Sequence, residues 1–202
     1  MTFDAVAPFY DSLARLFFGR SLIRAQQWGI GQVRSGSRVL MLGGGTGVTL
    51  PDLLSRQPSS VLFVEASGSM LTKARQRTQP DDPVSFQKGT EADLPETIQF
   101  DAILLPFVLD LYPFHTLQGQ MLPTLLDHLA PGGQLIVTDF ARPQTYWQQA
   151  YMWLMLRFFG LLANIPARQW TDWPMALRQA GLMEATGCSF RANQVRSGCW
   201  VR

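Results

Sequence analysis

The sequence predicts an α/β fold built on one mostly parallel β-sheet that helices cover on both faces. Short apolar segments alternate with segments of helical periodicity over most of the chain, and this alternation is typical of parallel sheets. A glycine-rich turn directly follows the first apolar segment. Near the end of the chain, two strand-like segments are joined by a link too short for a crossover, so they must pair as antiparallel neighbours.

Length and composition favour a single globular domain over residues 1–202. Of the 202 residues, 47% are hydrophobic and 16% are charged, which is sufficient for a large core. The net charge of +2 does not indicate a nucleic-acid partner. Cys188 and Cys199 are not spaced as metal ligands with the two histidines, so no metal site is expected. The first residues lack a signal-peptide pattern, and we expect a cytoplasmic location.

Five apolar segments are predicted to form the parallel strands. The fourth of them is apolar at nearly every position, as a central strand buried on both faces should be. In chain order, the predicted parallel strands cover residues 38–42, 61–65, 84–88, 100–107 and 134–140. The closing antiparallel pair covers residues 183–190 and 194–201.

Helices are predicted between these strands and at the N-terminus. Residues 1–35 show helical spacing, and they either pack on the sheet or form a lid over the site. We expect a helix to begin after Gly47, another near Ser67 and a third at residues 173–180. The helix before the fifth strand is predicted from four leucines at helical spacing, Leu122, Leu125, Leu126 and Leu129. It is expected to end at the Pro-Gly-Gly sequence of residues 131–133.

The glycine turn, Gly43-Gly44-Gly45-Thr46-Gly47, is the main indication of a ligand site. Glycine has no Cβ, so the backbone can approach a ligand closely, and the helix that follows offers free N–H donors. Val48 stands where the dinucleotide-binding pattern requires its third glycine, and the Gly-Lys-Ser/Thr sequence of a P-loop is missing. No tyrosine is followed four positions later by lysine, which argues against a short-chain dehydrogenase.

Glu65 is the second indication of a ligand site, because it ends the second predicted strand, which places it close to the glycine turn. A carboxylate at this point of a parallel sheet can accept hydrogen bonds from both ribose hydroxyls of a nucleoside. The alternative is an acid on the surface that caps the next helix. Together, the glycine turn and Glu65 predict a ligand that contains a nucleoside.

Five features occur in a shared order and spacing: the glycine turn, Glu65, and the segments 89–95, 100–102 and 129–133. In this arrangement the chain resembles class I S-adenosylmethionine-dependent methyltransferases over residues 5–202. With its early Tyr10-Asp11 pair it is similar to the small quinone-biosynthesis and lipid-type methyltransferases. The resemblance implies S-adenosyl-L-methionine as the cofactor. It also implies a Rossmann-like three-layer sandwich, whose seven-stranded, mostly parallel sheet has the order 3-2-1-4-5-7-6 with strand 7 antiparallel.

The resemblance further implies which residues bind the cofactor. The glycine turn would pass beneath the methionine and ribose portions, and Glu65 would hold the ribose hydroxyls. Ala66 and Met70 would flank the adenine, whose edge the loop at Thr90 and Glu91 would reach. The complete implied set is Tyr10, Gly43, Gly44, Gly45, Thr46, Gly47, Glu65, Ala66, Met70, Thr90, Glu91, Pro106 and Phe107. The last two, at the end of the fourth strand, would approach the departing methyl group.

Two positions depart from the pattern of this family. Its members usually carry an acid at the position of Met41, for the amino-acid portion of the cofactor, and Asp at the position of Thr90, for the adenine amino group. Each missing hydrogen bond costs about 1–3 kcal/mol of affinity if nothing replaces it. Glu91 is placed to stand in at Thr90. A catalytically weak or inactive module that binds S-adenosylmethionine is therefore the alternative to an active methyltransferase.

Methyl transfer from a sulfonium is an in-line displacement in which the protein mainly aligns the reactants and excludes water. A general base is needed only when the acceptor must lose a proton. The candidates near the carboxyl ends of the fourth and fifth strands are Asp110, Tyr112, His115 and Asp139. Asp110 has an alternative role as a helix N-cap and His115 as a surface residue, so the sequence singles out no catalytic residue.

The helical insert at residues 143–170 is the main indication of the acceptor. It is rich in aromatic residues and methionine, and apolar residues occur on all sides of the helix predicted within residues 146–165. That helix is a core helix, a homodimer interface, a peripheral membrane contact, or the wall of a pocket for an apolar small molecule such as a quinone precursor or lipid. Residues 104–107 lack the Asn/Asp-Pro-Pro-aromatic pattern, so a nucleic-acid base is not expected as acceptor.

Overall fold

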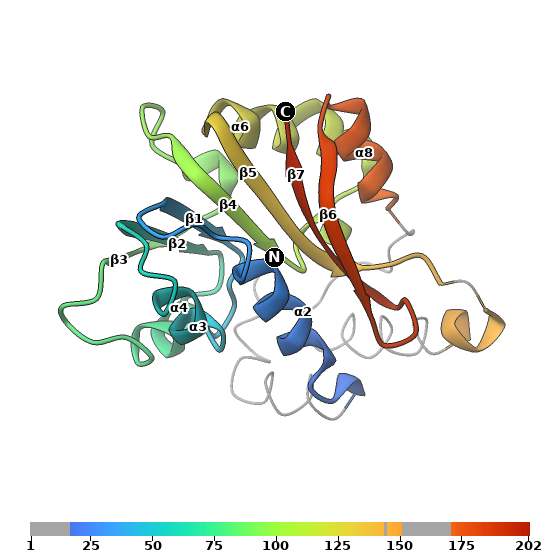
Figure 1. Ribbon diagram of the computed structural model, residues 1–202, viewed down its shortest axis with the longest axis horizontal. Coiled ribbons are helices and arrows are strands. Elements are labelled where there is room, and N and C mark those ends of the chain that lie inside the picture. The colour runs from blue at the N-terminus through green and yellow to red at the C-terminus, as the bar shows by residue number, and fades with distance from the viewer. Residues whose placement is uncertain (1–16, 144, 151–170) are drawn as a thin grey trace.

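The computed structural model describes residues 17–143, 145–150 and 171–202. Within this part of the chain, seven strands form one sheet of order β3-β2-β1-β4-β5-β7-β6 (Figure 1). Strand β7 runs antiparallel to both of its neighbours. The predicted fold class, the strand order and the antiparallel closing pair are therefore confirmed.

The strand boundaries agree with the predicted segments to within one residue, except at the start of β5. In chain order the strands are β1 (Arg38–Leu42), β2 (Ser60–Glu65), β3 (Val84–Lys88), β4 (Phe100–Pro106), β5 (Leu129–Phe140), β6 (Met183–Phe190) and β7 (Val195–Val201). β1 pairs in parallel with β2 on one side and with β4 on the other. β2 in turn pairs in parallel with β3, and β4 with β5. Their carboxyl ends meet at one edge of the sheet, where open α/β folds bind ligands.

Short helices connect the strands. In chain order they are α2 (Ser21–Ile30), α3 (Leu50–Leu54), α4 (Gly68–Arg75), η1 (Glu91–Asp93), η2 (Leu109–Leu111), α5 (Phe114–Thr116), η3 (Leu117–Met121), α6 (Leu122–Asp127) and α8 (Trp173–Gln179). Residues 146–150 are also helical. Pro51 lies in the first turn of α3, where a missing N–H costs nothing, and Ser67 caps α4. Among the described helices, none is long and apolar enough to cross a membrane.

Each face of the sheet has its own hydrophobic core, because successive residues of a strand point to opposite faces. Ile103 and Leu105 of β4 pack on one face with α6 and α8. Leu104 of β4 and Met41 of β1 pack on the other face with α3, α4 and the end of α2. Burial on both faces explains why β4 is apolar at nearly every position.

β5 begins at Leu129, five residues before its predicted start, so the helix predicted up to that residue is wrong at its end. Leu129 pairs with Phe100 of β4, and regular pairing resumes at Gln134. Residues 130–133 bulge out between these two points, and Gly132 has a φ of 72° there. The Pro-Gly-Gly sequence therefore marks a bulge within a strand and not the end of a helix.

Several predictions fall on residues outside the described part of the chain. They are Tyr10, the first sixteen residues of the predicted lid at 1–35, and most of the insert at 143–170. The described end of the lid segment, α2, packs on the sheet: a Cβ added to Gly29 would lie 3.0 Å from both Ile136 Cγ2 and Ser197 Oγ. The lid function stays a prediction.

Candidate cofactor site and active site

The glycine turn after β1 adopts a conformation that few side chains tolerate. Gly43, Gly45 and Gly47 have φ angles of 73°, 58° and 70°, in the left-handed region that favours glycine. A Cβ on Gly43 would lie 2.4 Å from Val108 Cγ2, and a Cβ on Gly47 would lie 2.8 Å from the Cβ of Ala74. At Gly45 the nearest atom would be 3.9 Å away. A Cβ on Gly44 would lie 2.4 Å from Phe63 Cε2, so the turn is tightly packed at Gly43, Gly44 and Gly47 and open at Gly45, where a ligand would approach.

Glu65, at the end of β2, ties the glycine turn to the start of α4. Its Oε2 accepts a hydrogen bond from Gly45 N–H at 2.9 Å, and its Oε1 accepts one from Ser67 N–H at 2.9 Å. The residue is only 6% exposed, so it is not a surface acid, although it does bond to the residue that caps α4. A carboxylate has about four acceptor positions, which allows it to hold the turn and still to accept from a ligand hydroxyl.

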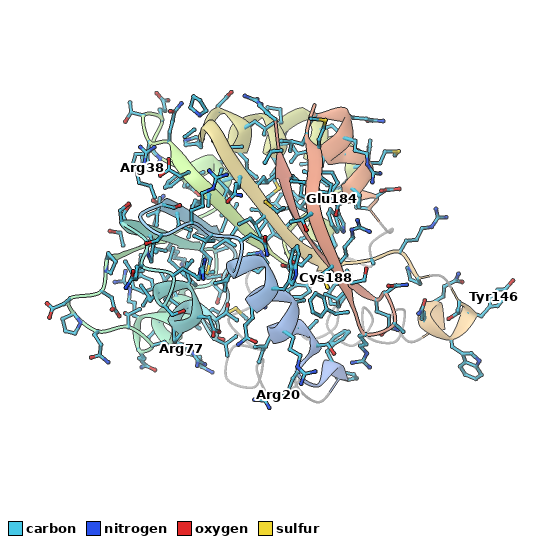
Figure 2. The ribbon with its side chains drawn as sticks, in the orientation of Figure 1. Arg20, Arg38, Arg77, Tyr146, Glu184 and Cys188 are labelled. Carbon is cyan, nitrogen blue, oxygen red and sulfur yellow. The ribbon has the colours of Figure 1, made fainter. Side chains whose placement is uncertain are left out.

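The start of α4 carries the other predicted residues on this side of the site. Ala66 is half-buried directly after Glu65, and Met70 is buried with its sulfur close to the open side of Gly45. Thr46 is buried, and its carbonyl oxygen accepts a hydrogen bond from Arg77 Nε at 2.8 Å. Arg77 follows α4, and Figure 2 shows it at the edge of the molecule near α3 and α4. The glycine turn, Ala66 and Met70 thus lie together at the carboxyl edge of the sheet.

Thr90 and Glu91 begin η1, and both make local hydrogen bonds. Thr90 N–H donates to Asp93 Oδ2 at 2.8 Å, and Thr90 Oγ1 accepts from Ala92 N–H at 3.3 Å, which caps η1. Glu91 Oε2 accepts from the Tyr112 hydroxyl at 3.0 Å. Tyr112, a predicted base candidate, therefore binds the residue predicted to replace the missing acid, and this bond joins the loops that follow β3 and β4.

β4 ends at Pro106, one residue before its predicted end, because Phe107 turns the chain out of the strand with a φ of 58°. Phe107 N–H still donates to the carbonyl oxygen of Thr138 at 2.7 Å. Its ring lies 5.1 Å from the ring of Phe140, measured between centroids. A positive φ is uncommon for a bulky residue, and such strained residues concentrate at functional sites. The sequence offers no signal for this conformation.

Asp139, near the end of β5, is fully buried and organises the turn after β4. Its Oδ2 accepts from Leu109 N–H at 2.8 Å and from Asp110 N–H at 3.2 Å, and its Oδ1 accepts from Phe140 N–H at 2.7 Å. Burial raises the pKa of Asp139 well above its ordinary value, and the nearby charge of Asp110 raises it further. Because three backbone donors enclose the carboxylate, Asp139 positions the turn and does not face an acceptor molecule.

The structure brings Asp110 and Asp139 together, and within the described residues no hydrogen bond or ion pair joins His115 to either of them. Asp110 lies within η2, whose N-cap is Val108, so its alternative role as a helix N-cap is wrong. Its side chain is half-buried, whereas His115 is exposed in α5. Within the described residues, no three side chains of the types His, Cys, Asp and Glu are grouped to hold a metal ion.

Gln26 belongs to the site region, although sequence analysis did not single it out. It borders a small hollow between α2 and the sheet, lined by Gln26, Ile30, Met41, Leu104, Leu105, Pro106, Ile136 and Thr138. Met41 is 2% exposed and contributes an apolar side chain to this lining. The sequence could have pointed to Gln26, because it is a polar residue on the apolar face of an amphipathic helix.

Comparison with known proteins identifies relatives of this chain. A family model described as a methyltransferase domain matches residues 39–133, which include the glycine turn, Glu65 and η1. A demethylmenaquinone methyltransferase of Clavibacter sepedonicus is 31% identical over 148 residues, which are 70% of this chain and 57% of that protein. A demethylmenaquinone methyltransferase of Tropheryma whipplei is 30% identical over 172 residues, which are 82% of this chain and 70% of that protein.

A solved structure supports the fold. One chain of the complex between the Haloferax volcanii Trm112 methyltransferase activator and a methyltransferase superposes with a TM-score of 0.73. The two chains are 20% identical, and the match covers 98% of this chain and 96% of that one.

Proposed function

The chain belongs to the S-adenosylmethionine-dependent methyltransferases, and we propose that it methylates a small, apolar acceptor such as a quinone precursor. The observation that carries the proposal is the contact of Glu65 with the glycine turn, because it sets a carboxylate beside an open stretch of backbone. The relatives described above as demethylmenaquinone methyltransferases support a quinone-type acceptor.

S-adenosylmethionine supplies the reactive methyl group when it is bound, and the chain supplies its binding surface. We expect the Glu65 carboxylate to accept hydrogen bonds from the ribose hydroxyls while it continues to hold Gly45 N–H. Ala66 and Met70 would form the apolar contacts of the adenine. Glu91 would reach the adenine edge only by sharing its carboxylate with the Tyr112 hydroxyl.

Alignment of the acceptor would fall to the turn after β4. Pro106 ends this strand and Phe107 follows it, and the hydrogen bond from Phe107 N–H to the carbonyl oxygen of Thr138 fixes the strained backbone of Phe107. Of the four base candidates we retain Asp110. Asp139 is enclosed by backbone donors, and the two remaining candidates are bound to Glu91 or exposed. A base at Asp110 is required if the acceptor is a hydroxyl or an aromatic carbon that loses a proton.

The segment from residue 146 onward would contact a membrane that holds the acceptor. Tyr146 is 89% exposed and Trp147 is 87% exposed, and Figure 2 shows Tyr146 pointing into solvent at the far side of the molecule from β3. Tyrosine and tryptophan combine an apolar ring with a polar group, which suits the boundary between lipid and water. We favour this peripheral contact over a homodimer interface, because a quinone or lipid acceptor is itself dissolved in the membrane.

Calorimetry and a methylation assay test the proposal together. The purified protein is titrated with S-adenosylmethionine and S-adenosylhomocysteine, and then assayed by mass spectrometry with a short-chain demethylmenaquinol, a phospholipid and a small amine. We expect binding of both cofactor forms and methylation of the quinol. Asp110→Asn should abolish methylation without weakening S-adenosylhomocysteine binding, whereas Asp127→Asn, at an exposed acid of α6, should change neither.

Two outcomes would contradict the proposal. Failure to bind either cofactor form would exclude methyl transfer altogether. Binding without methylation of any acceptor would favour the alternative, a module that binds S-adenosylmethionine without turnover, for which Met41 and Thr90 are the sequence evidence.

A further inference from the structure

Gln26 places a polar side chain where α2 otherwise buries apolar ones. Leu22 and Ile30, one turn before and one turn after Gln26, are buried, and Ala25 is fully buried beside it. Gln26 itself is half-buried. A carboxamide in this position requires hydrogen-bond partners, because burying it without them is costly.

Within the described part of the chain, one half of the Gln26 carboxamide has a hydrogen-bond partner and the other half has none. Its Oε1 accepts a hydrogen bond from Thr49 Oγ1 at 2.9 Å. Thr49 is 1% exposed and stands at the N-cap of α3, two residues after the glycine turn. This contact fixes the orientation of the carboxamide relative to the turn. Among the described residues, none accepts a hydrogen bond from Gln26 Nε2, so its two N–H groups remain to be used.

The unused donors border the hollow beside the carboxyl ends of β1 and β4. Its other polar lining residue is Thr138, whose hydroxyl is bonded to Ser197 Oγ at 2.7 Å. Met41 and Pro106 belong to the apolar remainder of the lining. Either hydroxyl of the Thr138–Ser197 pair can be the donor, so among the described residues of this lining Gln26 Nε2 is the side-chain donor without a hydrogen-bond partner.

We propose that Gln26 is a positioning residue for the cofactor, and that its amide N–H groups bind the carboxylate of the amino-acid portion of S-adenosylmethionine. The inference rests on the proposed function, because it assumes that this cofactor binds. The choice of the carboxylate follows from the hydrogen-bond roles: Gln26 Oε1 is held by Thr49, and the N–H groups donate to an anion but not to an ammonium group. Gln26 would thus provide a contact at the side where Met41 replaces the acid usual in the family.

Two ligands that differ in the amino-acid portion test this role. S-adenosylhomocysteine carries the portion and 5′-methylthioadenosine lacks it, so calorimetry with both separates this contact from binding of the nucleoside. Gln26→Met keeps the length of the side chain and removes its donors, and Gln26→Glu replaces them with a second carboxylate. The matched control is Gln27→Met, since the exposed Gln27 bonds to Asp52 on the surface.

We expect Gln26→Met to weaken S-adenosylhomocysteine about tenfold, or about 1.4 kcal/mol, and to leave 5′-methylthioadenosine unchanged. Gln26→Glu should weaken S-adenosylhomocysteine further, and Gln27→Met should affect neither ligand. Equal weakening of both ligands by Gln26→Met would overturn the inference in favour of a structural role, and so would unchanged binding of S-adenosylhomocysteine. Wild-type protein that binds neither ligand would instead overturn the proposed function, and the inference with it.

Discussion

Removal of the Glu65 carboxylate should damage both the fold and the site, because this group joins them. In Glu65→Ala, the N–H groups of Gly45 and Ser67 lose a charged acceptor. A hydrogen bond to a charged group contributes about 1.5–3 kcal/mol, with the high end applying to the fully buried Ser67 and the low end to the half-buried Gly45. We therefore expect the free energy of unfolding to fall by about 3–5 kcal/mol.

Urea unfolding followed by circular dichroism measures this loss, and calorimetry with S-adenosylhomocysteine measures the ligand contact. Glu65→Gln keeps one acceptor oxygen, so it should lose about half as much stability and about tenfold in affinity, or about 1.4 kcal/mol. Glu96→Ala, at an exposed acid, is the control and should be neutral in both measurements. If Glu65→Ala is as stable as the wild type, the anchoring role of its two hydrogen bonds is refuted. If Glu65→Gln is folded and binds with unchanged affinity, the role at the ribose is refuted.

Three further predictions test other parts of the molecule. Gly43→Ala should lower the free energy of unfolding in urea by about 1–3 kcal/mol more than Gly36→Ala does. Both positions have a positive φ, but only at Gly43 would a Cβ meet a neighbouring side chain. Equal losses of stability in the two variants would contradict this prediction. Because burial raises the pKa of Asp139 in the folded protein, the folded state binds more protons than the unfolded chain between the ordinary carboxyl pKa and that raised pKa. The stability of the wild type relative to Asp139→Asn should therefore fall as pH rises through this range, and parallel curves would contradict the prediction. Trp147→Ser should reduce the fraction of protein that sediments with anionic phospholipid vesicles. The control Met183→Ser, at a 67% exposed residue of β6, should leave this fraction unchanged. Equal effects of the two substitutions would exclude a membrane contact at Trp147.

The fold could be predicted from the sequence wherever local pattern and tertiary pairing agree. β3 and β6 have the predicted boundaries, because loop or turn residues flank a short apolar or alternating segment. The start of β5 could not be predicted, because Leu129 continues the leucine spacing of the helix and yet pairs with Phe100. A single sequence does not reveal which of these two interactions is stronger.

The candidate site likewise has parts that the sequence predicts and parts that it does not. Glu65 and the glycine turn can be located from their position at the ends of two predicted strands. The conformation of Phe107 and the bonds from Asp139 to Leu109 and Asp110 cannot be, since they join segments about thirty positions apart. The exposure of His115 also could not be derived from the sequence.

The two positions without the expected acid, Met41 and Thr90, are each built into their surroundings. An acid in place of Met41 would be buried in an apolar wall, which is costly unless it is paired. Thr90 caps η1 and donates its hydroxyl to Asp93 Oδ2 at 3.2 Å, so an aspartate there would set two carboxylates side by side.

Restoring either acid alone would therefore disturb the local structure. Gln26 borders the same hollow as Met41, and Glu91 directly follows Thr90. If these two neighbouring side chains take over the roles of the missing acids, as we propose, the chain keeps its cofactor contacts, and this favours an active methyltransferase over a module without turnover.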